Sequence, residues 1–322
     1  MKRRVLIAAV CGAVLWCLGA RAQPAKVWRI GFLRAARPPQ RELDAFLQAL
    51  SDKGFIQARN FVLVEQWGDG NVSRLPELAA ELVNKKVDIV VTEGTILVRA
   101  VAAASSTVPI VTASAADPFM GGLIKNLSRP GGNVTGFASM ERDISGKVFE
   151  IIKEMVPGLQ RIAVLSARSI WGLFAPGQDQ AAKSLGVEYS FVEMQRPEEV
   201  GSAMREALAR GAQGIVIRGS PFFSSTQRRL IIDSAAEHRL PTIYERRDDA
   251  EQGGLVSYAP DIQDQYRATA EYVVRILGGA SPGELPIQQP TKFDLIINLK
   301  TARALGLNVS PALLASASEV IE

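Results

Sequence analysis

The chain is poor in the residues on which most enzyme and metal sites depend. Its 322 residues include two cysteines, Cys11 and Cys17, and one histidine, His238. Both cysteines lie in the N-terminal stretch described below as a signal peptide, so with one histidine we expect no Ser-His or Cys-His pair for nucleophilic catalysis and no histidine-rich metal site. His238 lies at a predicted helix end before a strand, where a cap or a surface residue is expected. No GxxxxGK[ST] or GxGxxG fingerprint occurs either. We predict no catalytic residues, no metal and no cofactor.

Long apolar runs are also missing, apart from an uncharged stretch from Val5 to Ala20, which is too short to span a membrane comfortably. Basic residues precede it, and Ala20-Arg21-Ala22 has the small-x-small pattern of a cleavage site. These features predict a secretory signal peptide over residues 1–22 and a mature protein in the periplasm. The pair Arg3-Arg4 leaves a twin-arginine export route open.

Cleavage after Ala22 would change the charge and remove both cysteines. Four of the 37 basic residues lie in the predicted signal, so 33 remain against 33 acidic residues and the net charge becomes zero. A neutral chain gives no support to nucleic-acid binding. The mature chain would have no thiol or disulfide chemistry. About three hundred residues remain, enough for two domains.

The most informative stretch runs from Val87 to Pro118. A short β-branched run over 87–91 and a Pro-led run over 109–112 read as buried parallel strands, with an alanine-rich helix between them. Polar loops follow both strands, at the edge where ligands bind in such sheets. The first loop opens the helix, whose free N–H groups suit a carboxylate or another anion. The stretch therefore predicts a β-α-β unit that carries half of a binding site.

The same order of elements occurs twice. The strand at 161–165 repeats the strand at 29–33 with an offset of 132 residues, and Pro241 repeats Pro109 with the same offset. This predicts an α/β protein of two Rossmann-like lobes with parallel sheets and a ligand cleft between them. We assign residues 23–142 and about 258–288 to the first lobe. Residues 143–257 and about 289–322 form the second.

Five segments resemble one known family in the right order: residues 74–82, 128–136, 238–241, 253–258 and 289–302. They resemble the ABC-transporter substrate-binding family that includes tryptophan-binding (TrpX-like) proteins. The resemblance implies a type I periplasmic binding protein with three crossovers between its lobes, which closes around a small ligand. It also implies an ABC permease in the inner membrane as partner and a monomeric state.

The candidate ligand-binding residues lie in loops at the predicted ligand edge. In the first lobe they are Arg34, Glu93, Gly94, Thr95, Ser114 and Asp117. In the second lobe and near its crossover they are Trp171, Ser220, Pro221, Tyr244, Glu245 and Tyr258. The resemblance implies that the loop 93–95 holds a ligand carboxylate. Two loops depart from the family pattern: Leu33–Arg37 brings cations, and Ser166–Gly172 replaces an Asn-Pro type of loop.

Several of these residues have an alternative role. Trp171 could stack on a planar ligand or pack on its own lobe, and Arg34 could pair with a ligand carboxylate or be solvated. Thr95 would cap its helix in any case. Asp117 could bind an amine or only shape a turn, and Tyr258 could belong to the hinge.

We therefore predict a solute-binding protein of an ABC importer. Its ligand would be a small carboxylate-bearing compound, aromatic or otherwise apolar, enclosed by hinge closure. The alternative is a ligand-sensing receptor that signals to a membrane partner. An enzymatic role has no support in the residues.

Overall fold

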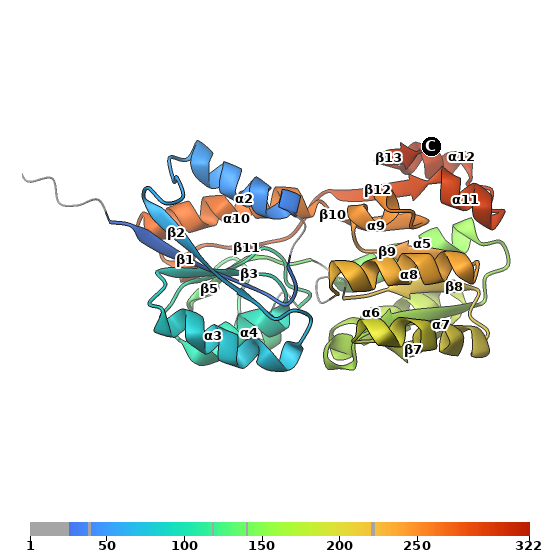
Figure 1. The fold of residues 1–322 in the computed structure, drawn as a ribbon, viewed down its shortest axis with the longest axis horizontal. Helices are drawn as coiled ribbons and strands as arrows, with labels where there is room; N and C mark the ends of the chain where they lie inside the picture. Colours follow the sequence, from blue (N-terminus) through green and yellow to red (C-terminus); the bar gives the residue numbers. More distant parts are fainter. Residues whose placement is uncertain (1–25, 38–39, 118, 140, 220–222) are drawn as a thin grey trace, which may run out of the picture.

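The structure is a computed structural model that describes residues 26–37, 40–117, 119–139, 141–219 and 223–322. The predicted signal peptide lies outside these ranges. The chain forms two α/β lobes that lie side by side (Figure 1). No helix in the described ranges is both long enough and apolar enough to cross a membrane.

The first lobe is built around a six-stranded sheet in the order β11-β5-β4-β3-β1-β2, in which all neighbours are parallel. Its strands are β1 (Trp28–Arg34), β2 (Phe61–Trp67), β3 (Ile89–Thr92), β4 (Ile110–Thr112), β5 (Val134–Phe137) and β11 (Ile287–Gln288). Its helices are α2 (Gln40–Asp52), α3 (Leu75–Asn84), α4 (Thr95–Ala104) and α10 (Ile262–Leu277). The predicted β-α-β unit is confirmed as β3, α4 and β4.

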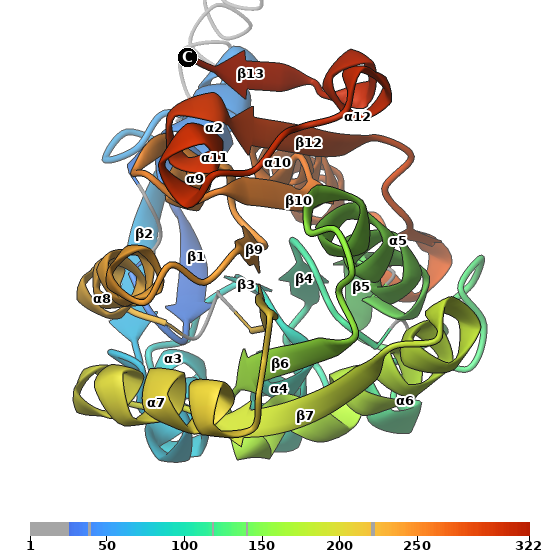
Figure 2. The ribbon, with the colours of Figure 1, turned by 90° about the vertical axis from the view of Figure 1, so that its right-hand side faces the viewer.

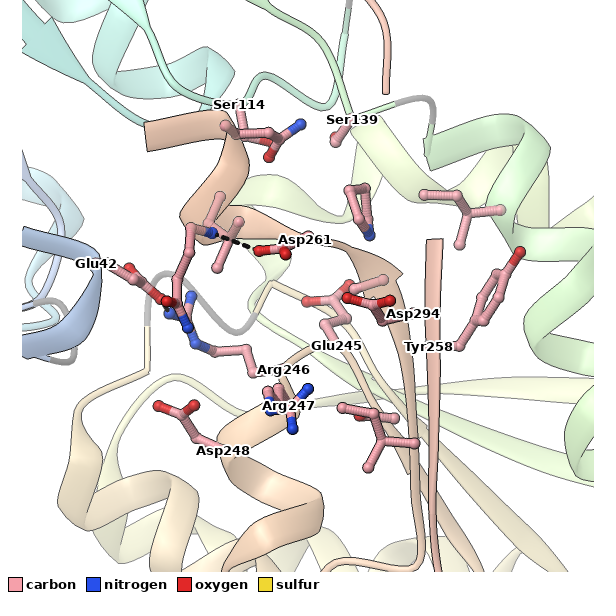
Figure 3. A pocket seen from close by; sticks show the side chains of 18 of the residues that line it. Glu42, Ser114, Ser139, Glu245, Arg246, Arg247, Asp248, Tyr258, Asp261 and Asp294 are labelled. Carbon is pink, nitrogen blue, oxygen red and sulfur yellow. Dashed lines mark hydrogen bonds and ion pairs between the residues drawn. The ribbon is translucent and has the colours of Figure 1, made fainter. Parts of the chain in front are cut away.

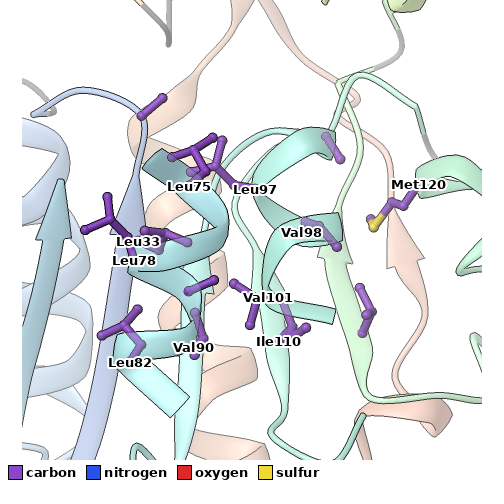
Figure 4. Packing of buried hydrophobic residues seen from close by; sticks show 14 of the residues in the cluster. Leu33, Leu75, Leu78, Leu82, Val90, Leu97, Val98, Val101, Ile110 and Met120 are labelled. Carbon is purple, nitrogen blue, oxygen red and sulfur yellow. The ribbon is translucent and has the colours of Figure 1, made fainter. Parts of the chain in front are cut away.

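Alternating side chains of the strands pack against helices on the two faces of this sheet. In β1, Phe32 points toward α2 and α10, whereas Leu33 points toward α3 and α4. Figure 4 shows the second packing, in which Leu75, Leu97 and Val101 cover the sheet. Both faces are thus buried, which explains why the strands read as continuous apolar runs in the sequence.

The second lobe is built around a seven-stranded sheet in the order β13-β12-β10-β9-β8-β6-β7. Figure 2 shows these strands from β13 at the top, through β12 and β10, to β6 and β7 at the bottom. The strands are β6 (Arg161–Ser166), β7 (Glu188–Glu193), β8 (Gly214–Ile217), β9 (Thr242–Tyr244), β10 (Val256–Pro260), β12 (Phe293–Asn298) and β13 (Glu319–Ile321). The helices are α5 (Glu141–Met155), α6 (Arg168–Leu185), α7 (Val200–Ala209), α8 (Ser225–Glu237), α9 (Arg247–Glu251), α11 (Leu299–Leu305) and α12 (Pro311–Ser316). Only the pairing of β10 with β12 is antiparallel among the described strands.

The internal repeat predicted from the offset of 132 residues is confirmed. The order β2-β1-β3-β4-β5 in the first sheet corresponds to β7-β6-β8-β9-β10 in the second. The prediction of a polar loop over Ser166–Gly172 is wrong, because α6 already begins at Arg168.

The chain crosses between the lobes three times, as predicted. The crossovers join β5 to α5, β10 to α10, and β11 to β12. Asp261 begins α10 by accepting hydrogen bonds from the backbone N–H groups of Gln263 (2.9 Å) and Asp264 (3.1 Å). Because three chain segments link the lobes, the relative motion that they permit is a hinge rather than free separation.

Candidate ligand-binding site

A cavity of about 310 Å³ lies between the two lobes (Figure 3). Its walls come from the ends of β3, β4 and β5 in the first lobe and of β8 and β9 in the second, together with the crossovers. The lining residues are Arg41, Glu42, Glu93, Ser114, Ser139, Ile144, Arg218, Glu245, Arg246, Arg247, Asp248, Ser257, Tyr258, Ala259, Pro260, Asp261, Ile262, Gln263, Gln265, Asp294 and Ile296. The cavity thus occupies the sheet edges at which a ligand is expected.

Charged groups of the two lobes meet beside this cavity. Arg41 in the first turn of α2 pairs with Asp248 of α9 and also contacts Glu251, with 3.1 Å between Nη1 and Oε2. The adjacent Glu42 pairs with Arg246, which precedes α9 (Figure 3). Both pairs join opposite lobes, so they exist only when the lobes are close together.

A buried polar cluster lies next to these pairs in the first lobe. Nη1 of Arg34 is 2.7 Å from Oε2 of Glu93, and the hydroxyl of Tyr266 donates to the same oxygen at 2.8 Å. Arg34 is also 3.7 Å from Glu42. Burial raises the pKa of Glu93, and the positive charge of Arg34 opposes this rise. Burial lowers the pKa of the Arg34 guanidinium, and Glu93 opposes that change.

The second lobe holds a matching set of buried charges. Arg218 contacts Glu245 at 3.2 Å and donates to the hydroxyl of Ser145 at 3.1 Å. Arg228 lies 3.3 Å from Asp249. Burial raises the pKa of Asp249 to about 6, against the opposing charges of Arg228 and Arg246. Burial also lowers the pKa of Arg246 to about 10.

The raised pKa of Asp249 predicts a pH-dependent stability. Its folded pKa of about 6 lies above the ordinary value of 3.8, so the folded state binds this proton more tightly than the unfolded state. The free energy of unfolding contributed by this group therefore falls as pH rises from about 4 to 6. In Asp249→Asn the contribution is absent, and we expect the stability of the variant relative to wild type to rise by about 2 kcal/mol between pH 4 and pH 7.

Urea unfolding at several pH values measures this difference. Asp233→Asn is the matched control, because Asp233 is exposed on α8 and pairs only with Arg229 among the ion pairs described. A difference between Asp249→Asn and wild type that is the same at pH 4 and pH 7 would contradict the account.

The cavity has an apolar wall beside its charged groups. The ring of Tyr258 stacks on Phe293, with centroids 5.7 Å apart and an angle of 19° between the rings. Ile144 and Ile296 add aliphatic surface, and Ser114 and Ser139 supply hydroxyl groups from the first lobe. Such a mixed lining fits a small molecule with one polar end and one apolar end.

The lining carries six carboxylates and four guanidinium groups. Arg41, Arg218 and Arg246 each pair with a carboxylate of the lining, and Arg247 pairs with Glu251 and Glu319. Asp294 lies 3.7 Å from Lys292, whose side chain is largely exposed. The lining therefore has an excess of negative charge, which favours a cationic group in whatever binds there. Within the described ranges, no group of three or more His, Cys, Asp or Glu residues is placed to hold a metal ion.

The structure brings four of the predicted residues together in this cavity: Glu93, Ser114, Glu245 and Tyr258. Arg34 lies outside the lining, and its guanidinium is neither solvated nor open to a ligand, because Glu93 and Glu42 surround it. Ser220 and Pro221 lie outside the described residues.

The loop 93–95 is arranged differently from the prediction. Gly94, at a φ of 100°, is the N-terminal cap of α4, so the prediction that Thr95 caps this helix is wrong. The hydroxyl of Thr95 instead accepts the backbone N–H of Asp117 at 3.0 Å. Asp117 in turn accepts the N–H groups of Phe119 and Gly121 and so shapes its turn. Gly94, Thr95 and Asp117 are absent from the cavity lining.

The two remaining second-lobe residues pack within the protein. Trp171 lies in α6 and stacks on Phe191, with ring centroids 4.6 Å apart. Tyr244 is buried and packs against Gly254. Neither residue lines the cavity.

Glu42, Arg218, Asp261 and Asp294 line the cavity but were not predicted. Glu42 had a recognisable signal, since it shares the buried face of α2 with Ala45 and Phe46, where a carboxylate requires a partner. Asp261 and Asp294 flank crossovers whose path between the lobes is a property of the whole fold.

Two similar lobes, three crossovers and a cavity at the facing sheet edges define a two-lobed binding protein. The same architecture occurs in solved periplasmic binding proteins of type I, as predicted. Residues 40–321 match the family described as ABC transporter substrate binding protein, and the chain belongs to this family. It is therefore a substrate-binding protein of an ABC transporter, of an extracytoplasmic family, and not an enzyme.

Three known proteins are similar to this chain. A tyrosine-binding protein of Clostridioides difficile (strain R20291) is 23% identical over 273 residues, which cover 81% of this chain and 75% of the relative. The ABC domain from Streptococcus pneumoniae, solved in complex with L-Trp, has a TM-score of 0.82 at 23% identity, over 92% of this chain and 100% of that one. A conserved domain protein from Vibrio cholerae O1 biovar El Tor has a TM-score of 0.82 at 25% identity and the same coverage.

Proposed function

We propose that the protein is a periplasmic receptor that binds an amino acid with an aromatic or apolar side chain in the interlobe cavity. The lobes close around the solute by hinge motion, and the closed complex delivers it to a permease in the inner membrane. The observation that carries the proposal is the 310 Å³ cavity, whose walls come from both lobes. This volume is at the lower end of the range for small-molecule sites, so it suits a solute of amino-acid size.

The chemistry of the walls supports this class of ligand. The excess of carboxylates favours an ammonium group, and the hydroxyls of Ser114 and Ser139 are suitable donors for a carboxylate. The stacked pair Tyr258–Phe293 offers an aromatic surface for a planar side chain. The ligands named for the two relatives, tyrosine and tryptophan, have all three features.

We further propose a monomer with two lobes, each made of two segments of the chain and joined by three crossovers. The first lobe comprises residues 23–142 and about 262–288, and the second comprises 143–260 and about 289–322. A boundary near residue 260, rather than the predicted 258, is supported by the extent of β10, which belongs to the second sheet and ends at Pro260. Residues 1–22 are proposed as a cleavable signal peptide.

A thermal-shift panel tests the ligand class. It contains L-tryptophan, L-tyrosine, L-phenylalanine and L-leucine, with tryptamine and indole-3-propionate as analogues that lack one charged group of tryptophan. At one hundred times its Kd, a ligand stabilises the native state by about 2.7 kcal/mol. We expect at least one amino acid to raise Tm by about 5 °C or more and both analogues to have much smaller effects. If tryptamine raised Tm as much as tryptophan does, the proposed need for a ligand carboxylate would be contradicted. If no member of the panel raised Tm, the proposal itself would be contradicted.

A further inference from the structure

The ion pairs between α2 and α9 are placed where lobe opening must break them. Arg41 and Glu42 occupy the first turn of α2, and their partners Asp248 and Arg246 lie at the start of α9. Figure 3 shows Glu42, Arg246 and Asp248 together at one side of the cavity. Arg41 has a further contact across the lobes, to Glu251 at 3.1 Å.

Burial makes the inner pair sensitive to the loss of one partner. Glu42 is 1% exposed and Arg246 is 7% exposed. Glu42 also faces Arg34 of its own lobe at 3.7 Å, so it lies between guanidinium groups of both lobes. Lobe opening would rehydrate Glu42 and Arg246, whereas removal of one partner alone leaves a buried charge uncompensated in the closed form. The closed arrangement therefore depends on the complete set of charges.

The outer pair has a different character. The side chains of Arg41 and Asp248 are 34% and 14% exposed, so solvent ions reach them. Salt screens such a pair much more than it screens buried charges. A third interlobe contact is apolar, since Ile170 and Phe174 of α6 pack in one cluster with Leu75 and Leu97 of the first lobe. Added salt does not screen that contact, whereas it weakens the exposed ion pair. The response to salt therefore distinguishes the two kinds of contact.

We propose that Arg41, Glu42, Arg246 and Asp248 form a latch that keeps the lobes closed before a solute is bound. The inference rests on the proposed hinge closure for its functional meaning. A solute enters only after the latch has opened, and the same contacts form again in the liganded closed state. The latch therefore stabilises the free and the bound closed forms alike, and it controls the rates of entry and release more than the affinity.

The first test measures the distance between the lobes without any ligand. Spin labels are placed at Asp44→Cys on α2 and Glu237→Cys on α8, two exposed positions of opposite lobes. The native cysteines lie in the predicted signal peptide, so they do not compete for the label. For the wild-type background we expect one predominant short distance. Arg41→Ala and Glu42→Gln should each shift the ratio of open to closed molecules at least tenfold toward open.

Lys53→Ala is the matched control for these variants. Lys53 is a cation that follows α2, and its partner Glu271 lies on α10 of the same lobe, at 3.6 Å. Its removal should leave the distance distribution unchanged. Arg41→Ala and Asp248→Ala should be non-additive when combined, because each removes the same contact. Since both side chains are partly exposed, these variants fold even where Glu42→Gln is destabilised. A predominantly open wild type, or identical distributions in all variants, would overturn the proposal.

The second test measures rates with L-tryptophan as the probe. In Arg41→Ala we expect association and dissociation both to accelerate at least threefold. A latch that forms only after binding would instead weaken affinity and leave the association rate unchanged, which would overturn the proposal. The distance measurement needs no ligand. If no amino acid of the panel binds, the ligand assignment fails, and the distances still decide whether the latch exists.

Discussion

Arg34→Met is expected to destabilise the protein by about 3–5 kcal/mol at neutral pH, the usual effect of removing one partner of a buried ion pair. Arg34 is the cation that contacts Glu93, and both side chains are almost fully buried. Without it, the hydrogen bond from Tyr266 is what the carboxylate of Glu93 keeps among the described residues. Urea unfolding monitored by circular dichroism measures the change, with the exposed Arg37→Met as control.

The pH dependence of this effect has a definite sign. Burial already raises the pKa of Glu93, and loss of Arg34, which opposes the rise, raises it further. A raised folded pKa means that stability is lost as pH rises from the unfolded pKa through the folded one. The variant should therefore be less destabilised at pH 5 than at pH 8. The double variant Arg34→Met/Glu93→Gln removes both charges and should recover most of the stability. A double variant no more stable than Arg34→Met would contradict this account.

Ser114→Trp is expected to abolish ligand binding, with at least a hundredfold increase in Kd, or about 2.7 kcal/mol. Ser114 lines the cavity at the end of β4 (Figure 3). An indole ring at this position would fill a large part of the 310 Å³ and prevent the lobes from closing on a solute. The backbone carbonyl of Ser114, which accepts hydrogen bonds from Gly94 and Thr112, is retained in the variant.

Isothermal titration with the amino acid that gives the largest thermal shift measures this effect. Ser106→Trp makes the same substitution at an exposed position of the same lobe, beyond α4. It should bind the ligand like wild type. Equal affinity of Ser114→Trp and Ser106→Trp would place the binding site elsewhere.

Most of the fold could be predicted because the strands are buried on both faces. The runs at 30–33, 89–91 and 215–217 are apolar throughout, and the order of the elements followed from the repeat with its Pro-led strands. α6 was missed because Gly172, Pro176 and Gly177 lie within it and are typical helix breakers. β7 is an edge strand in which one of the six residues is fully buried, so it lacks a strong apolar signal.

The site could be predicted only at the level of loops. The ends of β3, β4 and β9 were located correctly, and Glu93, Ser114 and Glu245 at these ends line the cavity. The ion pair between Arg34 and Glu93 could not be predicted, because the two residues are 59 positions apart in the sequence and meet only in the folded sheet. The part of the wall near Asp294 comes from a strand that follows the last crossover, whose position depends on the docking of both lobes.

Native mass spectrometry tests the central claim that the interlobe cavity holds a small solute. The protein is measured as purified from its own host and again after incubation with the amino-acid panel. The account predicts that wild type carries one small-molecule adduct of amino-acid mass and that Ser114→Trp carries none. A wild type that remains bare under both conditions, or an adduct retained equally by Ser114→Trp, would contradict it.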